Sequence, residues 1–185
     1  KLSIPASTLR EAVNKILTVV DKKNSRPILT NCLLKAEKNQ LQLIATDLEV
    51  SAKIILPAKI DSEGSFCISS KNFSDILREL PNEDVVLSVD NGGNLLNLNC
   101  KNISYSLVIT SSDEFPQLTF QNQSSEFKLK TKQIAHIINK TSHAISTDET
   151  RLYLNGIYWQ LMDSKLRAVA IDGHRLALLD TAEFI

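Results

Sequence analysis

One stretch of the sequence occurs twice and decides the fold. NCLLKAEKNQLQLIATDLEVSA, from Asn31 to Ala52, is repeated as NGIYWQLMDSKLRAVAIDGHRLA, from Asn155 to Ala177, with one residue inserted. In the first copy, and on to Leu56, short runs rich in Ile, Val and Leu alternate with polar breaks, which favours strands over a helix. We therefore expect three antiparallel strands there, and the repeat implies the same for the second copy.

The repeat extends to the helix before each stretch, at a constant offset of 125 residues. Eight positions of the first segment correspond to eight of the second: Leu2, Ile4, Leu9, Ala12, Val13, Asn14, Lys15 and Val20 to Phe127, Leu129, Ile134, Ile137, Ile138, Asn139, Lys140 and Ile145. This predicts a complete domain over residues 1–122. A second domain over 125–185 matches only the first half of the first, so we expect the chain to be a fragment.

Within the first domain the pattern predicts strand, helix and three strands, twice over. Ser7 is the expected N-cap of a helix over residues 7–20, and a second helix runs from Ser69 to Leu80, before Pro81. Strands follow at 85–89, 95–98 and 103–109, the first two joined by the turn sequence DNGGN. The polar stretch 111–125 is expected to lie at the domain boundary.

Composition excludes several classes of protein. Lys and Arg together number 21, as do Asp and Glu, so there is no overall charge to attract a polyanion. No apolar run is long enough for a membrane span, and no secretory signal is visible, which makes a cytoplasmic location the expectation. Cys32, Cys67 and Cys100 are widely spaced and are expected to be buried, reduced thiols. No motif indicates catalysis, a bound metal or a cofactor.

Five segments, in order and spacing, resemble the bacterial DNA polymerase III β subunit, the sliding clamp family, in its amino-terminal half. They are RPILTNCLL (26–34), ATDLEV (45–50), DEFPQL (113–118), TRLYLNGI (150–157) and AIDGHRLAL (170–178). The resemblance implies an α+β protein with the DNA-clamp fold, built from repeated β-α-β-β-β units with helices on one face and antiparallel sheets on the other. A third domain would be absent here.

The function that this resemblance implies is that of a non-enzymatic processivity factor. Two three-domain chains would close into a ring around double-stranded DNA without reading its sequence, as a homodimer when full length. Short peptide motifs of the DNA polymerase III α subunit, the clamp loader and other replication or repair proteins would bind a pocket on the ring. No cofactor is implied.

Candidate DNA contacts come partly from charge and partly from the resemblance. From Phe127 to Thr147 there are four lysines and no acidic residue, and the expected helix places Lys132, His136, Lys140 and His143 along one face. A merely solvated face remains the alternative. The other candidates are Lys22, Lys23, Arg26 and Lys71, of which Lys23 and Lys71 match basic positions of the family. Asp148 stands where family members can carry a neutral polar residue near DNA.

Two further sets of residues are assigned by the resemblance. The peptide pocket would comprise Arg151, Tyr153, Leu154, Ile171, Gly173, His174, Arg175 and Leu176, with Ile171 where many members have a hydroxyl residue. The subunit interface would involve Ile76, Leu80, Tyr105 and Leu107. For the interface residues, ordinary core packing is the alternative, and Tyr105 is the preferred candidate because aromatic residues are enriched at interfaces.

Two other functions stay open at this point. A protein-interaction scaffold without a DNA role would keep the apolar pocket but not use the basic helix face. An enzyme could use Asp172 and His174, with Asp47 and Glu49 in the first copy, as acid and base. Against the enzyme, Asp47 and Asp172 are equivalent in the repeat, and a turn-capping role accounts for both copies.

Overall fold

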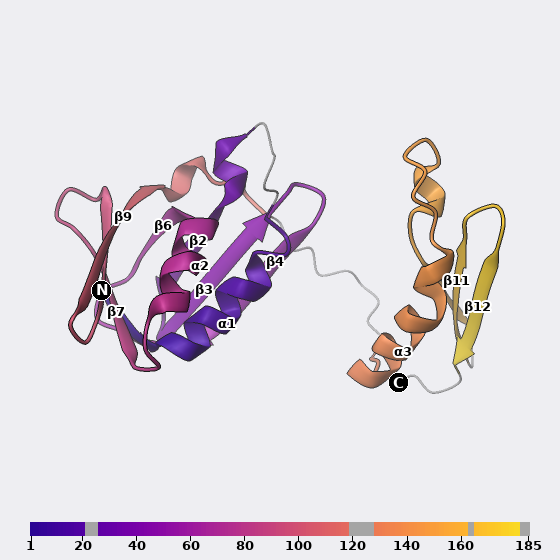
Figure 1. The fold of residues 1–185 in the computed structure, drawn as a ribbon, viewed down its shortest axis with the longest axis horizontal. Helices are drawn as coiled ribbons and strands as arrows, with labels where there is room; N and C mark the ends of the chain where they lie inside the picture. The colour runs from indigo at the N-terminus through magenta and orange to yellow at the C-terminus, as the bar shows by residue number, and fades with distance from the viewer. Residues whose placement is uncertain (21–25, 119–127, 163–164, 182–185) are drawn as a thin grey trace. The chain divides into compact units, whose positions relative to one another are not determined.

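The computed structural model describes residues 1–20, 26–118, 128–162 and 165–181. It divides into two compact units, which we call unit 1 (1–119) and unit 2 (120–185) and describe separately (Figure 1). Lys22 and Lys23 lie outside the described residues, as do positions 119–125 of the expected boundary. None of the helices in the described ranges is long and apolar enough to cross a membrane.

The first helix, α1, spans Ala6–Ile16. Its buried residues recur at helical spacing and face the core: Ala6, Leu9, Ala12, Val13 and Ile16. The prediction of Ser7 as its N-cap is wrong, since the N-cap is Pro5 and no side chain caps the helix. The backbone N–H of Ala6 instead donates to the carbonyl of Glu83, 2.9 Å away, so a tertiary contact holds the start of the helix. The helix also ends earlier than the expected residue 20.

Three antiparallel strands follow α1, as predicted: β2 (Asn31–Glu37), β3 (Gln40–Thr46) and β4 (Ser51–Pro57). In β2, Cys32, Leu34 and Ala36 are buried in alternation with more exposed residues. This period of two is what a sheet with one face against a core requires.

The second half of unit 1 repeats this order with β6 (Gly64–Ser69), α2 (Ser70–Glu79), β7 (Asp84–Val89), β8 (Leu95–Cys100) and β9 (Ile103–Ser111). Here the predicted cap is present, because the Ser69 hydroxyl accepts from the N–H of Asn72. The predicted DNGGN hairpin is also present. In it, Asp90 Oδ1 accepts from the N–H groups of Asn94 and Leu95, each at 2.9 Å.

The strands of unit 1 form one continuous antiparallel sheet that nearly closes on itself. Their order is β4-β3-β2-β6-β9-β8-β7-β1-β5, with β1 at Leu2–Pro5 and β5 at Lys59–Ile60. Only Ala58 separates β5 from β4, so the strand order returns to its starting point. The two halves are equivalent, since β1 pairs with β7 and β6 pairs with β2.

Both helices of unit 1 lie on the same side of the sheet and pack against each other (Figure 1). One apolar core fills the space between helices and strands, and it includes fully buried Leu9, Phe73 and Leu77. Cys32 and Cys100 belong to this core, and all three cysteines are free and buried, as predicted. Cys32 is paired with Ile68 and Cys67 with Leu33, so the thiols of Cys32 and Cys67 point to opposite faces of the sheet.

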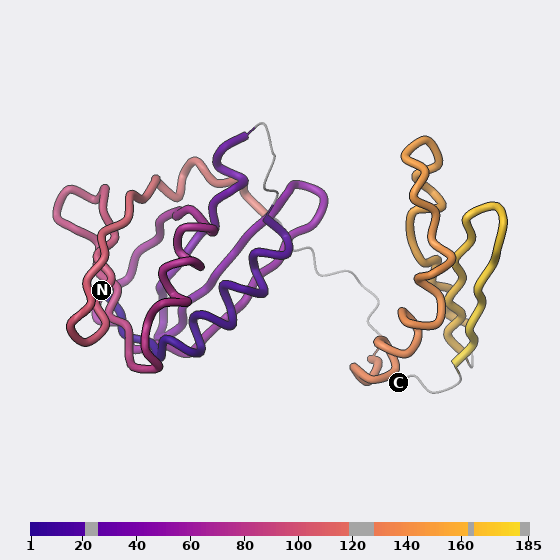
Figure 2. Tube along the Cα trace, in the orientation of Figure 1, coloured from indigo at the N-terminus to yellow at the C-terminus, as the bar shows by residue number. Residues whose placement is uncertain are grey.

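Unit 2 repeats the order of the first half of unit 1, a helix followed by three antiparallel strands (Figure 2). Helix α3 spans Thr131–Thr141, which is α1 displaced by 125 positions. Strands β10 (Tyr158–Met162), β11 (Lys165–Ile171) and β12 (Leu176–Thr181) form a three-stranded antiparallel sheet. Its register keeps the same offset: Ala45 pairs with Ala52 in unit 1, and Ala170 with Ala177 in unit 2. The predicted equivalence of the two copies is therefore confirmed.

Two features of unit 2 differ from the expected pattern. Residues 128–130 form no strand before α3, whereas β1 precedes α1. In unit 1, β1 is paired on one side with β7 and on the other with β5. Ile134 and Ile138 are 37% and 42% exposed, although the equivalent Leu9 and Val13 are fully buried. Ile137, between them, is buried.

Candidate functional sites

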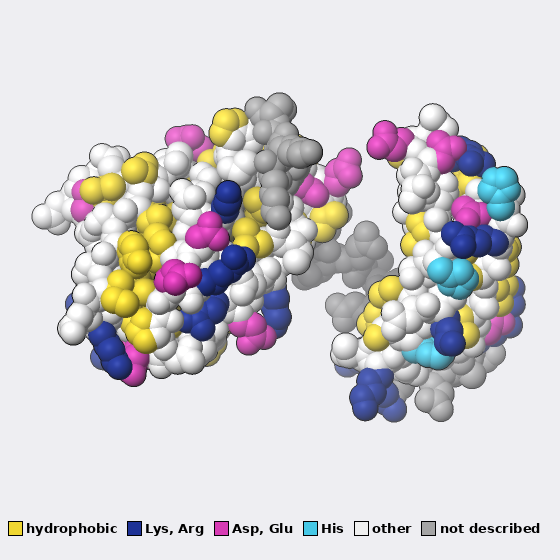
Figure 3. All heavy atoms as spheres, in the orientation of Figure 1, with side chains coloured by type: hydrophobic (Ala, Val, Ile, Leu, Met, Phe, Trp, Pro, Cys, Tyr) yellow, Lys and Arg dark blue, Asp and Glu magenta, His cyan; other side chains and the backbone are white. Residues whose placement is uncertain are grey.

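Helix α3 and the 3₁₀ turn Ser142–Ala144 that follows it carry a cationic face, which we define by Lys132, His136 and Lys140 of α3 and His143 of the turn. All four are exposed, and the spacing of the first three places them on successive turns of the helix. Figure 3 shows dark blue and cyan side chains on the visible side of unit 2, with magenta side chains among them only toward its upper end. The sequence from 128 to 147 adds two more lysines and no acidic residue, so positive charge is not compensated locally. Such a face suits the phosphates of a nucleic acid.

The candidate DNA contacts in unit 1 are more scattered. Lys71 is exposed at the second position of α2. It borders a hollow of about 540 Å³ where the end of α1 meets the start of α2, together with Ser69, Asn72 and Arg78. Arg26 is exposed at the N-cap of the 3₁₀ turn Pro27–Thr30. Lys71 and Arg26 belong to unit 1 and α3 belongs to unit 2. Because the two units are described separately, no distance between these residues and α3 is given.

The β11–β12 turn is the centre of the second candidate site. Asp172 Oδ1 accepts from the backbone N–H groups of His174 and Arg175, each at 2.9 Å. In unit 1 the Asp47 carboxylate does the same for Glu49 and Val50. The prediction that both aspartates cap turns is thus confirmed, and these N–H bonds lower the pKa of Asp172 to about 2.

The segment 145–151 faces this turn. Together the segment and the turn line a hollow of about 310 Å³ in unit 2, which we call the unit 2 hollow. Its lining residues are Ile145, Ser146, Thr147, Asp148, Arg151, Asp172, His174 and Arg175. Of the predicted pocket residues, Arg151, His174 and Arg175 line it directly. Gly173 lies beside it, because a Cβ atom there would come within 3.2 Å of Arg151 Nη1.

The remaining predicted pocket residues are not among those that line the hollow. Tyr153, Leu176 and Ile171 are exposed apolar side chains, at 81%, 57% and 37%. Leu154 is half-buried, and its carbonyl accepts from the N–H of Ser146 at 3.1 Å. The structure therefore brings a polar hollow and exposed apolar side chains into the same unit.

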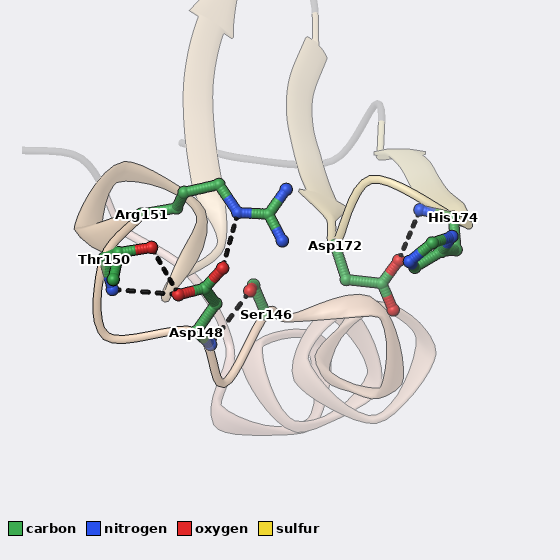
Figure 4. A network of polar contacts seen from close by, with 6 residues as sticks. All are labelled: Ser146, Asp148, Thr150, Arg151, Asp172 and His174. Atoms are coloured by element: carbon green, nitrogen blue, oxygen red, sulfur yellow. Dashed lines mark hydrogen bonds and ion pairs between the residues drawn. The ribbon is translucent and has the colours of Figure 1, made fainter.

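Asp148 is the functional candidate whose role sequence reasoning missed. Its Oδ1 accepts from the N–H and the hydroxyl of Thr150, at 2.9 and 2.6 Å, and its Oδ2 accepts from Arg151 Nε at 2.8 Å (Figure 4). The Thr150 bonds, followed by that from Arg151, lower the pKa of Asp148 to about 2. The signal available in the sequence was the DETR run, in which a side chain can cap the two following residues.

The predicted subunit-interface residues divide into two groups. Leu80 and Leu107 are 4% and 9% exposed and belong to the core of unit 1, which leaves little of either side chain for contact with another subunit. Ile76 is half-buried and packs against the same core. Tyr105 is 38% exposed on β9. Sequence reasoning missed Val108, 76% exposed on the opposite face of β9 and paired with exposed Leu95.

No group of three or more His, Cys, Asp or Glu side chains in the described ranges is placed to hold a metal ion. The carboxylates of Asp47 and Asp172 accept hydrogen bonds from the backbone N–H groups of their own turns. This disfavours the hypothesis that these residues act as a catalytic acid and base.

Comparisons with known proteins identify this architecture. Residues 1–119 match the family described as "DNA polymerase III beta subunit, N-terminal domain", and residues 128–183 match its "central domain". The beta sliding clamp of Caulobacter vibrioides is 37% identical over 97% of the chain, and that of Rickettsia felis is 32% identical over 96%. The crystal structure of the Caulobacter crescentus clamp superposes with a TM-score of 0.92 at 36% identity, covering 98% of this chain.

Two repeated α+β units with helices packed on curved antiparallel sheets place the chain in the DNA-clamp class of fold. The chain belongs to the DNA polymerase III β subunit family, whose N-terminal and central domains it matches in order. It spans about half the length of the relatives named above, 50% of the Caulobacter vibrioides protein and 47% of the Rickettsia felis protein.

Proposed function

We propose that the protein is a processivity factor for DNA polymerase, a sliding clamp without catalytic activity of its own. The observation that carries the proposal is the match of both units, in order, to the two domains of the β subunit, with a TM-score of 0.92 to a solved clamp. The mechanism is topological: a closed ring cannot leave a duplex except at an end. Affinity for DNA can then stay weak while sliding stays fast.

The cationic face of α3 supports the DNA-binding part of this proposal. Lys132 and Lys140 contact phosphates, and Lys71 and Arg26 add contacts from unit 1, with Lys22 and Lys23 beyond the described residues. Such contacts address the backbone and do not read the base sequence. Neutral overall charge agrees with weak binding, because only this local excess attracts the duplex.

The unit 2 hollow and its apolar surroundings form the docking site for partner peptides. Exposed Tyr153, Ile171 and Leu176 contact apolar anchors, while Arg151, His174 and Arg175 orient the peptide backbone. The proposed partners are the DNA polymerase III α subunit, the clamp loader and other proteins with clamp-binding motifs, in the cytoplasm. The full-length protein forms a homodimer, to which Tyr105 and Ile76 contribute contacts.

Retention on circular DNA tests the proposal. We expect the assembled protein to stay on a nicked circular plasmid at high salt and to be lost once the plasmid is cut to a linear duplex, because only topology then holds it. A protein scaffold without a DNA role would show no difference between circular and linear DNA, and that result would overturn the proposal.

Salt titration of the initial, non-topological binding tests the cationic face. Each phosphate contact removed lowers the slope of log K against log salt by about 0.9. We expect Lys132→Gln with Lys140→Gln to lower the slope by about 1.8. Lys165→Gln, which removes a lysine paired with Asp180 at 2.7 Å, is the matched control and should leave the slope unchanged. Equal slopes for all variants would exclude α3 as the DNA contact.

A further inference from the structure

Helix α2 is followed by residues that cannot continue it. Its last helical residue is Glu79, and the C-cap Leu80 is extended, with φ −77° and ψ 145°. Pro81 comes next, which has no N–H and disfavours the helical conformation of the residue before it. In α1, by contrast, the N–H of Leu17 continues the helical pattern by donating to the carbonyl of Val13 at 3.0 Å. The last carbonyl groups of α2 therefore need donors from another segment.

Arg10 of α1 supplies these donors. Its Nε donates to the carbonyl of Leu77 at 2.7 Å, and its Nη2 donates to the carbonyl of Leu80 at 2.6 Å. Its third nitrogen, Nη1, donates to Asn82 Oδ1 at 3.1 Å, beyond the end of the helix. One half-buried guanidinium thus bonds both the last turn of α2 and the connection to β7, and its positive charge suits the negative end of the helix dipole.

The same connection also holds the start of α1. The carbonyl of Glu83 accepts from the N–H of Ala6, the first residue of α1, at 2.9 Å. Ala6 and Arg10 are four residues apart, so they lie on the same face of the helix. The two helices therefore cap each other: residues 80–83 receive the first N–H of α1, and Arg10 of α1 satisfies the carbonyls at the end of α2.

The equivalent helix of unit 2 is built differently. At the position of Arg10 it has Ala135, whose side chain has no donor. Its start is capped locally, because the N–H of Lys130 donates to Gln133 Oε1 at 2.9 Å. The repeat itself thus does not require an arginine here, and the role of Arg10 belongs to the contact between α1 and α2.

We propose that Arg10 is a positioning residue that holds the last turn of α2 in place for the contact between subunits. This inference rests on the proposed homodimer, to which Ile76 of α2 contributes. Ile76 directly precedes Leu77 and lies one turn before Leu80, so the two carbonyl bonds of Arg10 fix the turn that carries it. The side chains of Leu77 and Leu80 are buried and keep this turn against the core, whereas Arg10 fixes its backbone. Without Arg10 the turn opens more often, while the rest of unit 1 keeps its fold.

The dissociation constant of the full-length homodimer, measured by analytical ultracentrifugation, tests this role. We expect Arg10→Met to raise it about tenfold, the scale expected when hydrogen bonds from a charged group are lost. Arg10→Lys should raise it only about threefold, because one ammonium group reaches part of what the planar fork bonds. Lys15→Met is the matched control: it removes an exposed basic side chain of the same helix, paired with Glu11 at 2.7 Å, and should leave the constant unchanged.

Amide hydrogen exchange of the present chain separates positioning from a general loss of stability. If Arg10 only stabilises unit 1 as a whole, Arg10→Met accelerates exchange by the same factor in α2 and in β3. Positioning predicts a local effect, because single turns open without unfolding of the domain. We expect the N–H groups of residues 76–79 to exchange about tenfold faster relative to those of β3, and Arg10→Lys to restore part of the protection.

The outcomes keep this inference apart from the proposed function. An unchanged dissociation constant in Arg10→Met would overturn the positioning role and leave the homodimer intact. Equal acceleration of exchange in α2 and β3 would also overturn it, since Arg10 would then act on the whole of unit 1. A full-length protein without substitutions that stays monomeric would refute the proposed homodimer, and the positioning role with it. The unsubstituted protein alone decides that question, so the two failures are distinguishable.

Discussion

At the residue scale, the two β-turns that follow β3 and β11 show how the same backbone is built from different side chains. The residue after the capping aspartate has a positive φ in both units: 81° at Leu48 and 94° at Gly173. Glycine adopts this conformation without steric cost, whereas an L side chain there brings its Cβ close to a carbonyl oxygen. Unit 1 therefore contains backbone strain that unit 2 avoids.

Replacing Leu48 by glycine should relieve this strain. The Leu48 side chain is 51% exposed, so little burial is lost. We expect Leu48→Gly to raise the free energy of unfolding by about 0.5 kcal/mol, the balance of strain relief of about 1 to 2 kcal/mol and the entropic cost of glycine. Urea denaturation monitored on unit 1 measures it. Glu49→Gly, next in the same turn and without a positive φ, is the control and should lower stability. A loss in Leu48→Gly as large as in the control would contradict the prediction.

The Asp148 carboxyl provides a pH test of its bonding. Its pKa is lowered from 3.8 to about 2 by Thr150 first and then by Arg151. A group with a depressed native pKa stabilises the fold fully above its ordinary value and loses that contribution as the pH falls through the native value. The loop should therefore be unaffected between pH 8 and pH 5. The ¹³Cγ signal of Asp148 should titrate below 3.8, and in Arg151→Gln its midpoint should rise without reaching 3.8. A midpoint at or above 3.8 in the unmodified chain would show that these bonds are absent in solution.

At the element scale, α1 and α3 occupy the same place in the repeat but differ in how much of each is covered. Leu9 is fully buried in α1, where α2 and the strands complete the core, and the equivalent Ile134 in α3 is 37% exposed. Replacing each residue by alanine therefore compares a buried position of α1 with the partly exposed equivalent position of α3.

We expect Leu9→Ala to cost about 2 to 5 kcal/mol of stability, as for other large-to-small changes in a core. Ile134→Ala should cost about 1 kcal/mol or less, because its side chain already contacts water. Chemical denaturation of each variant, followed by signals from its own unit, measures both. Equal losses would mean that Ile134 is as covered as Leu9.

At the scale of the whole molecule, the two units differ in the size of their cores. Unit 1 has one continuous apolar cluster that spans both helices and the sheet. The described residues of unit 2 form two small clusters, one of Ile137, Leu166 and Ala168 and the other of three alanines. Burial of apolar area is the main stabilising contribution, so unit 2 should be the less stable of the two.

The chain contains natural probes for the difference in stability between the two units. Its single tryptophan, Trp159, packs against the first cluster of unit 2, and its three cysteines are buried in unit 1. We expect the fluorescence of Trp159 to change at a lower urea concentration than the one at which the cysteines react with a thiol reagent in pulse labelling. Burial also raises the pKa of Cys32 to about 12, which keeps its thiol unreactive until unit 1 opens. Coincident transitions would show that the units unfold together.

The sequence alone determined the repeat and its elements. Its period of 125 residues located α3 and the strands of both units, because alternating and helical apolar patterns are set by which faces must be buried. It also identified the capping role of Asp47 and Asp172, since a bond from a side chain to the next few N–H groups depends only on neighbouring residues.

The tertiary structure decided what depends on contacts between distant residues. It placed Leu80 and Leu107 in the core, left Ile134 and Ile138 partly exposed, and started α1 at a bond to Glu83 instead of at a Ser7 cap. It also showed that Asp148 orients Arg151 beside Gly173, across from the Asp172 turn. Local sequence cannot specify these features, because burial and side-chain orientation are set by segments that meet only when the chain is folded.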